Sequence, residues 1–323
     1  MSREANQAPA GATAGPPRGS TPAGEIRAVP VRHWGRWVSA VVVLLAVAWL
    51  VQAGLGAHAV DFAVVRKYLT SEQILTGLRN TIVISVLAQV TGIALGVVFA
   101  VMRLSRNPVL SSVSTFYIWF FRGTPVLVQL LFWYSAVPLV FQHLAIAVPF
   151  TGVVLVSVPM TSFMTPFMAA FLGLGLNEGA YMAEIVRAGI LSVDEGQMEA
   201  SSALGMTSGQ TMRRIVLPQA MRVIIPPTGN EFISMLKTSS LASVITYEEL
   251  LRKAQNIYST NLEVLPLLVV VSIWYLVLTS IASIGQYYIE RRYARGSARA
   301  LAETLPQRLR RNLALGRPHD GGV

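Results

Sequence analysis

Ionisable side chains stand within two apolar stretches of this sequence, where a charge is costly unless it meets a partner or water. Tyr181, Glu184 and Arg187 are spaced three residues apart, which places them on one broad face of a helix. A carboxylate on such a face can bind an ammonium group, or Glu184 can form an ion pair with Arg187 that only fixes helix packing. Both interpretations of Glu184 stay open, and Arg187 is better explained by packing.

A second polar stripe follows a proline pair. Asn230, Ser234 and Lys237 recur at helical spacing, and Glu231 begins an adjacent stripe. A lysine at mid-depth in a membrane could bind a carboxylate. The alternative is that Asn230 and Glu231 tie down a helix broken after Pro226–Pro227, while Lys237 reaches toward an interface.

The elements that carry these residues are apolar segments. The chain has 323 residues, of which 53% are hydrophobic and 13% are charged. Apolar runs of about 20 residues recur, and each can cross a hydrocarbon core as a helix. We therefore predict an all-α polytopic membrane protein with about six transmembrane helices. The predicted crossings are residues 37–57, 77–102, 125–141, 166–188, a segment from 226 onward, and 264–289.

Basic residues are concentrated at both ends of the chain, which has a net charge of +10. Residues 1–36 predict a disordered basic tail, residues 37–57 a retained transmembrane helix, and residues 291–323 a second basic tail. Such flanks predict that both termini are cytoplasmic. No nucleic-acid-binding module accompanies the charge, so nucleic acid is not an expected partner. The sequence has no cysteine, which excludes disulfides and thiolate metal sites, and we predict no catalytic or metal-binding residue.

A polar segment between the fourth and fifth crossings faces the cytoplasm in this topology. Ser192 with Glu195 resembles a capping box, which predicts that a helix starts at Val193. Gly205 can adopt the left-handed conformation that ends a helix.

A second short helix follows in the same segment. Thr207 with Gln210 predicts its start through another capping box. Pro218 cannot continue a helix interior, so this helix is expected to end by about Val216. A polar helix–turn–helix that projects from a membrane domain suits a protein partner.

This segment resembles the "EAA" loop of ABC-importer permeases. The family has Glu-Ala-Ala, a Gly and a late Leu-Pro at fixed intervals. This chain has Glu199-Ala200-Ser201, Gly205 and Leu217-Pro218 at the same intervals, with Ser201 in place of the second Ala. The resemblance implies a coupling helix that rests in a cleft of a separate ATPase subunit. The implied ATPase-coupling residues, within a loop at 199–218, are Glu199, Ala200, Gly205, Ile215, Leu217 and Pro218.

Further motifs resemble the polar amino-acid permeases of the histidine, glutamine, arginine and opine type, over residues 70–290. Members commonly have five crossings, so residues 37–57 are an N-terminal addition. In many relatives Asp or Asn follows the Lys of the Leu-Lys motif, where this chain has Thr238. The motifs are Arg122–Pro125 with Gln129, Asn177–Tyr181, Ala183–Arg187, Gly196–Gln197, Pro218–Ala220, Pro226–Pro227, Gly229–Glu231 and Leu236–Lys237.

The resemblance implies a type I ABC-importer transmembrane domain that moves polar amino acids across the bacterial cytoplasmic membrane by alternating access. The sequence has no Gly-x-x-x-x-Gly-Lys-Ser/Thr loop, so we expect ATP and Mg²⁺ on a partner ATPase dimer and no cofactor on this chain. The other expected partners are a second permease copy, identical or related, an extracytoplasmic amino-acid-binding protein, and membrane lipid. An amino acid is a zwitterion, so the candidate pathway residues carry both signs: Tyr181, Glu184, Asn230, Glu231, Ser234 and Lys237.

Two other classes of function are less consistent with the sequence. A secondary transporter or channel driven by an ion gradient would leave the helix–turn–helix without a role. An intramembrane hydrolase would need a serine with a buried base, but the four histidines, His33, His58, His143 and His319, lie in predicted tails or loops. Neither the amino acid carried nor the choice between homodimer and heterodimer follows from the sequence.

Overall fold

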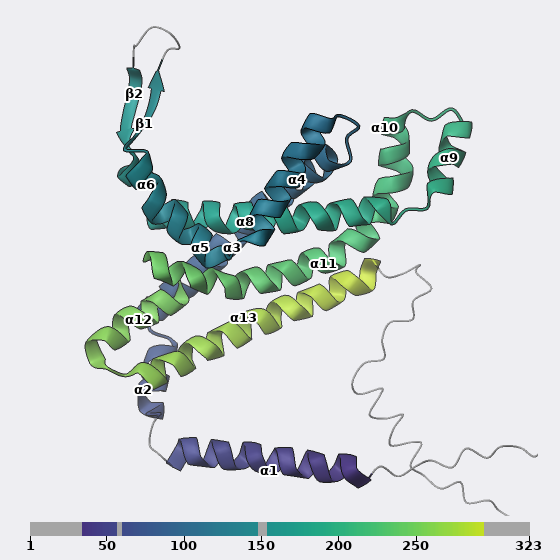
Figure 1. The fold of residues 1–323 in the computed structure, drawn as a ribbon. Coiled ribbons are helices and arrows are strands. Elements are labelled where there is room, and N and C mark those ends of the chain that lie inside the picture. The colour runs from purple at the N-terminus through teal and green to yellow at the C-terminus, as the bar shows by residue number, and fades with distance from the viewer. Residues whose placement is uncertain (1–33, 57–59, 148–153, 294–323) are drawn as a thin grey trace, which may run out of the picture. The chain divides into compact units, whose positions relative to one another are not determined.

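The computed structural model describes residues 34–56, 60–147 and 154–293, and these are mostly helical (Figure 1). The chain divides into two units, residues 1–57 and 58–323. Most of the two predicted basic tails, residues 1–33 and 294–323, lies outside the described part.

The described part of the first unit, residues 34–56, forms the helix α1 (Trp34–Gly56), which begins three residues before the predicted crossing. Its described side chains are exposed, and Trp37 is 74% exposed. A helix that is apolar all round suits lipid or the interior of a larger assembly.

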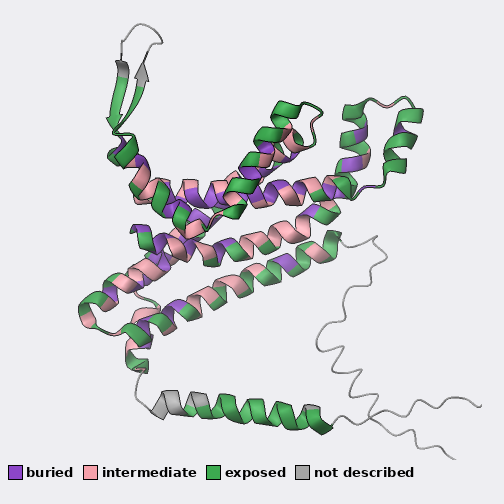
Figure 2. Cartoon of the chain, viewed as in Figure 1, coloured by how far each residue is buried: buried purple, intermediate pink, exposed green. Residues whose placement is uncertain are grey.

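Helices α3 (Glu72–Arg103) and α8 (Pro166–Leu191) pack closely in the second unit. Glycines make this approach possible: a Cβ at Gly92 would overlap Glu178, and a Cβ at Gly96 would overlap Met182. Small residues allow membrane helices to approach in this way. Figure 2 shows buried residues along the length of α8.

A sharp bend separates α4 (Pro108–Gly123) from α5 (Val126–Leu131), the π-turn Phe132–Ala136 and α6 (Val137–Val140). The two arms differ in direction by 103°. Pro125 has no N–H to continue the helix, and the Gln129 amide donates hydrogen bonds to the carbonyls of Phe121 and Thr124 at 2.9 and 3.1 Å. The backbone at the bend is therefore satisfied by a side chain.

Helix α11 (Leu217–Thr238) corrects the prediction that the fifth crossing starts near Pro226, because it contains both prolines in its interior. Neighbouring carbonyls receive side-chain donors: Thr228 Oγ1 donates to Ile224 O at 2.8 Å and Gln286 Nε2 to Pro226 O at 2.6 Å. Such donors allow a membrane helix to continue through proline. A 3₁₀ segment (Ser239–Ile245) and α12 (Leu250–Asn261) follow.

Among the described residues, only α3 and α13 (Val264–Tyr293) are long and apolar enough to cross a membrane, or three spans if the bent α4–α6 pair counts as one. Helix α8 carries Asn177, Glu178, Glu184 and Arg187, and α11 carries a proline pair. Length and hydropathy alone therefore identify only part of the predicted crossings.

The segment between the predicted crossings at 125–141 and 166–188 contains an antiparallel hairpin, β1 (His143–Ala147) and β2 (Val154–Pro159), followed by α7 (Met160–Phe163). Leu144 pairs with Val158 and Ala145 with Ser157. β-branched residues in β2 favour the strand. This hairpin is an addition to the all-helical pattern that we predicted.

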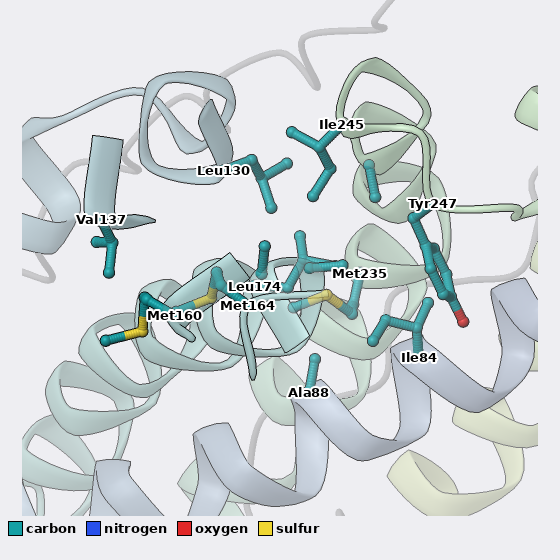
Figure 3. Close-up of a cluster of buried hydrophobic side chains, with 13 residues drawn as sticks. Ile84, Ala88, Leu130, Val137, Met160, Met164, Leu174, Met235, Ile245 and Tyr247 are labelled. Carbon is teal, nitrogen blue, oxygen red and sulfur yellow. The ribbon is translucent and has the colours of Figure 1, made fainter. Parts of the chain in front are cut away.

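The largest buried cluster among the described residues joins six helices and the 3₁₀ segment through residues far apart in the chain. Figure 3 shows Ile84 of α3, Leu130 of α5, Leu174 of α8, Met235 of α11 and Ile245 of the 3₁₀ segment facing one another. A second cluster joins α2 (Phe62–Leu69) and α12 to α13. The first cluster anchors α5, α8 and α11, which together form the candidate site.

Candidate functional site

A cavity of about 320 Å³ lies between α5, α8 and α11. Val126, Leu174 and Met235 form its apolar wall. The size and the mixed lining suit a small polar molecule. The polar residues that line it are Asn177, Glu178, Tyr181, Glu231, Ser234 and Thr238.

Three of the predicted pathway residues, Tyr181, Glu231 and Ser234, line this cavity. Glu184 is not part of the lining, and it accepts hydrogen bonds from Arg187 Nη2 and Nε at 2.7 and 3.1 Å. The packing interpretation of Glu184 therefore has the geometry it requires.

Asn230 and Lys237 are exposed and lie outside the cavity lining. They are seven residues apart on the continuous helix α11, so they share one face. A charged side chain exposed at membrane depth needs a partner or water. A role for Lys237 in the pathway stays a prediction.

Three polar residues of the cavity, Asn177, Glu178 and Thr238, were not among the predicted pathway residues, and Glu178 is the charged one. Its side chain is 4% exposed, and Gln89 Nε2 of α3 donates a hydrogen bond to Glu178 Oε1 at 3.1 Å. The missing side chain of Gly92 leaves the space that Glu178 fills. One signal was available, because Glu178 is the charged residue of α8 farthest from both helix ends.

The cavity has an uneven charge distribution. Glu178 and Glu231 are close enough to repel each other, and Arg122 at the end of α4 attracts Glu231. The Arg122 guanidinium also lies 5.1 Å from the centre of the Tyr181 ring, within the range of a cation–π contact. Two carboxylates and one guanidinium can together bind a molecule that carries both signs of charge.

The end of α4 is held against α8 by two hydrogen bonds. Asn177 Nδ2 donates to Phe121 O at 2.8 Å, and the Tyr117 hydroxyl donates to Leu176 O at 2.7 Å. Asn177 lines the cavity, and the Phe121 carbonyl to which it donates also accepts a hydrogen bond from Gln129 Nε2. These contacts fix the backbone next to Arg122, and with it the side of the cavity that carries the cation.

The polar segment forms two short helices, α9 (Glu195–Ala203) and α10 (Ser208–Thr211). The prediction that Ser192 caps the first one is wrong. Ser192 ends α8, where its hydroxyl donates to Gly189 O at 2.7 Å. Asp194 is the cap of α9, and its carboxylate accepts from the Gly196 N–H at 2.8 Å.

The turn between the two helices confirms the predicted role of Gly205, whose φ is +75°. The N–H groups of Gly205 and Met206 donate to the carbonyls of Ser202 and Ser201 at 3.0 and 3.1 Å, which is the Schellman pattern of helix ends. The capping box of Thr207 and Gln210 is also confirmed, with both of its hydrogen bonds present.

The prediction that the second helix ends by Val216 is wrong. A π-turn, Met212–Val216, joins α10 to α11 without a break, and the Leu217 N–H bonds to Met212 O. The wider turn comes just before Pro218, which lies in the first turn of α11 where its missing N–H is tolerated. The coupling segment is therefore continuous with a helix that lines the cavity.

Ser201, which departs from the family pattern, has a structural role. Its hydroxyl lies 2.9 Å from Thr211 Oγ1, and both side chains are buried. This contact ties α9 to α10, and alanine could not make it. The exposed surface of the pair includes the apolar residues Met198 and Leu204, which are 40% and 81% exposed.

Five of the six predicted ATPase-coupling residues are exposed, and Figure 2 shows that α9 is mostly exposed. Glu199 and Ala200 lie on the exposed surface of α9, and Gly205 is exposed in the turn. Leu217 and Pro218 are exposed where α11 begins, and Ile215 is half-buried in the π-turn.

Comparison with known proteins identifies the family. The family described as "Binding-protein-dependent transport system inner membrane component" matches residues 92–295. The chain belongs to this family of importer permeases. Residues 1–91, which include α1, α2 and the first part of α3, and residues 296–323 lie outside the matched region.

The permease has relatives along most of its length. It is 46% identical to the arginine transport system permease protein of Corynebacterium glutamicum, over 92% of this chain and 90% of that protein. It is 34% identical to the glutamine transport system permease protein of Escherichia coli K12, over 68% and 92%.

Solved structures agree on the fold. A crystal structure of an amino acid ABC transporter with histidines is 36% identical, with a TM-score of 0.61 over 72% of the permease and 99% of that chain. An inward-facing methionine ABC transporter, 17% identical with a TM-score of 0.56, supports the fold alone.

These relatives confirm the predicted fold class and function class. The permease is a membrane transport subunit of the amino-acid ABC importer family, and its structural neighbours are importer permeases rather than secondary transporters. It is not an enzyme, and a separate ATPase subunit hydrolyses ATP. A substrate-binding protein is its other expected partner in this family.

Proposed function

We propose that this permease imports amino acids with a cationic side chain and that the cavity of Glu178 and Glu231 receives them. The observation that supports this is a cavity lined by two carboxylates, with the Arg122 guanidinium next to two of its lining residues, Tyr181 and Glu231. Arginine or lysine carries two positive groups and one carboxylate, which complements that set. The Corynebacterium relative is named for arginine transport.

In this proposal the two carboxylates bind the α-ammonium group and the side-chain cation, and Arg122 binds the α-carboxylate. Glu178 is buried and already accepts one hydrogen bond from Gln89. A charge held in a low-dielectric site binds an opposite charge more strongly than it does in water. The cavity therefore favours a dication over a neutral amino acid.

The assembly that we propose has two permease copies, identical or related, and a cytoplasmic ATPase dimer on their α9–α10 segments. ATP and Mg²⁺ bind to the ATPase, and this chain binds no cofactor. ATP binding draws the ATPases together and moves α9 and α10. Because α10 continues into α11, this movement reaches Glu231 and Ser234 and alternates access to the cavity.

Both termini lie in the cytoplasm in this proposal. The basic residues that precede the first helix and follow Glu290 support this orientation. The α9–α10 segment then lies on the side where the ATPase binds, and the β1–β2 hairpin on the side where the binding protein delivers substrate.

The test is uptake by Glu178→Gln and Glu231→Gln, two changes that keep the side-chain shape and remove the charge. A hydrogen bond to a charged group contributes about 1.5–3 kcal/mol, so we expect the KM for arginine to rise at least about tenfold in each variant. The measurement is arginine uptake into vesicles that contain the complete transporter.

Glu184→Gln is the matched control, because Glu184 lies on the same helix but outside the cavity. We expect it to leave the KM for arginine close to that of the unmodified protein. An equal rise in all three variants, or no rise in the first two, would contradict the proposed substrate site.

A further inference from the structure

A second cavity, of 370 Å³, lies between α3, α11 and α13. Most of its wall is apolar, formed by Ile225, Gly229 and Phe232 of α11 and by Ala282, Gly285 and Ile289 of α13. Gly285 and Ile289 are exposed, so the cavity is an open groove between two helices rather than a sealed core.

On each of the two helices, an arginine lies on the same face as the residues that line the groove. On α11, Arg222 precedes Ile225 by three residues and Gly229 by seven, so the three share a face. On α13, Arg292 follows Ile289 by three residues and Gly285 by seven. Figure 1 shows the start of α11 beside the end of α13, so both arginines lie at the same end of the groove.

These arginines have no partner among the described residues. Both are exposed, and neither forms an ion pair or a side-chain hydrogen bond there. Glu290, the nearby acid on α13, accepts a hydrogen bond from Gln286 Nε2 at 2.8 Å. The groove therefore ends in two cations that have no partner among the described residues, at the start of α11 and the end of α13.

The polar groups along the groove are mostly used within the protein. Thr228 Oγ1 donates to Ile224 O, and Gln286 Nε2 donates to Pro226 O and Glu290. Gln89, which also lines the groove at α3, donates to Glu178 through Nε2, and its Oε1 has no hydrogen-bond partner among the described residues. The apolar wall of the groove suits a hydrocarbon chain. An anionic group is favoured at the end of the groove where the two arginines lie.

We propose that this groove binds one anionic phospholipid, with an acyl chain along Phe232, Gly229 and Ile225 and the phosphate against Arg222 and Arg292. A lipid whose headgroup also carries a cation offers these arginines less attraction. The site is distinct from the substrate cavity, which is lined by a different face of α11. Exposed Tyr288 on α13 suits the depth of the headgroups.

The test uses the complete transporter purified in detergent, with phosphatidylglycerol or phosphatidylcholine added and the retained lipid counted by native mass spectrometry. Each basic residue near an anionic headgroup contributes roughly fivefold in binding. We therefore expect Arg222→Gln with Arg292→Gln to lower retention of phosphatidylglycerol by about 25-fold. Retention of phosphatidylcholine by the unmodified transporter should be much weaker.

Two further variants distinguish the site from general charge effects. Gly285→Leu should displace the acyl chain, and the Cβ that it adds meets no protein atom within 4 Å. Arg103→Gln with Arg106→Gln removes the same charge at the end of α3 and should leave retention unchanged. Equal retention of both lipids, or equal losses in the two double variants, would overturn the proposal. So would a photoreactive residue at position 285 that captures protein rather than lipid.

Discussion

Glu178 shows how a functional side chain in a membrane depends on its neighbours. It is buried against α3, where Gly92 leaves it space and Gln89 supplies a hydrogen bond. A buried carboxylate without such a donor would cost several kcal/mol. Spacing within α8 could not predict this position, because the glycine and the glutamine come from another helix.

Residues that line the cavity were predictable only where one helix determines them. The spacing of Glu231 and Ser234 on α11 predicted a shared polar face, and both line the cavity. The same reasoning placed Lys237 in the pathway, yet it is exposed outside the lining. A helical stripe is wider than a cavity, so the sequence cannot show which of its residues face inward.

The α-carboxylate of the substrate provides a test at this scale. Neither Arg122 nor Lys237 is part of the cavity lining, but the Arg122 guanidinium lies 5.1 Å from the centre of the Tyr181 ring and attracts Glu231, and both of these residues line the cavity. We therefore expect Arg122→Gln to raise the KM for arginine about tenfold, since a charge-assisted hydrogen bond is lost. Lys237→Met should raise it much less. Both are measured as uptake at matched amounts of assembled transporter.

The opposite ranking of these two variants would change which residue is assigned to the α-carboxylate of the substrate. If Lys237→Met abolishes uptake while the complex remains assembled, and Arg122→Gln has little effect, the lysine rather than the arginine binds the carboxylate. That result would revive the interpretation drawn from the spacing of the α11 stripe.

The structure of the coupling segment could be predicted from the sequence where interactions between neighbouring residues determine it. Gly205 and the box of Thr207 with Gln210 act within a few residues of backbone, and both predictions are confirmed. The stop at Pro218 was wrong because a π-turn changes the hydrogen-bond pattern just before the proline. Residue propensity contains no signal for that turn.

Gly205 gives the test at the scale of the element. A Cβ at this position meets no neighbour within 4 Å, so only the left-handed backbone resists substitution. A β-branched residue is strained there by about 1–2 kcal/mol or more. We expect Gly205→Val to reorient α10 and reduce the stimulation of ATP hydrolysis by loaded binding protein.

Gly205→Asn is the matched control, because asparagine tolerates the left-handed conformation better than other residues with a Cβ. It should retain most of the stimulation. If valine and asparagine give the same stimulation as glycine, the turn geometry has no part in coupling.

At the scale of the whole molecule, the helices that line the cavity are less apolar than the helices that hydropathy identifies as membrane spans. Helices α3 and α13 are apolar enough to identify as spans, whereas α8 and α11 carry the cavity and fall short of the same test. The family motifs, rather than hydropathy, predicted the fold correctly. The β1–β2 hairpin was not predicted, because its residues read equally well as an apolar loop.

The central claim is that this chain moves amino acids only within an ATP-driven complex, through a coupling segment continuous with α11. The most direct measurement is uptake of labelled arginine into proteoliposomes that contain the permease, its ATPase and its binding protein. We expect uptake to require ATP on the side of the membrane where the ATPase lies. We also expect uptake to continue when ionophores collapse all ion gradients. Uptake that ignores ATP and stops with the ionophores would contradict the claim.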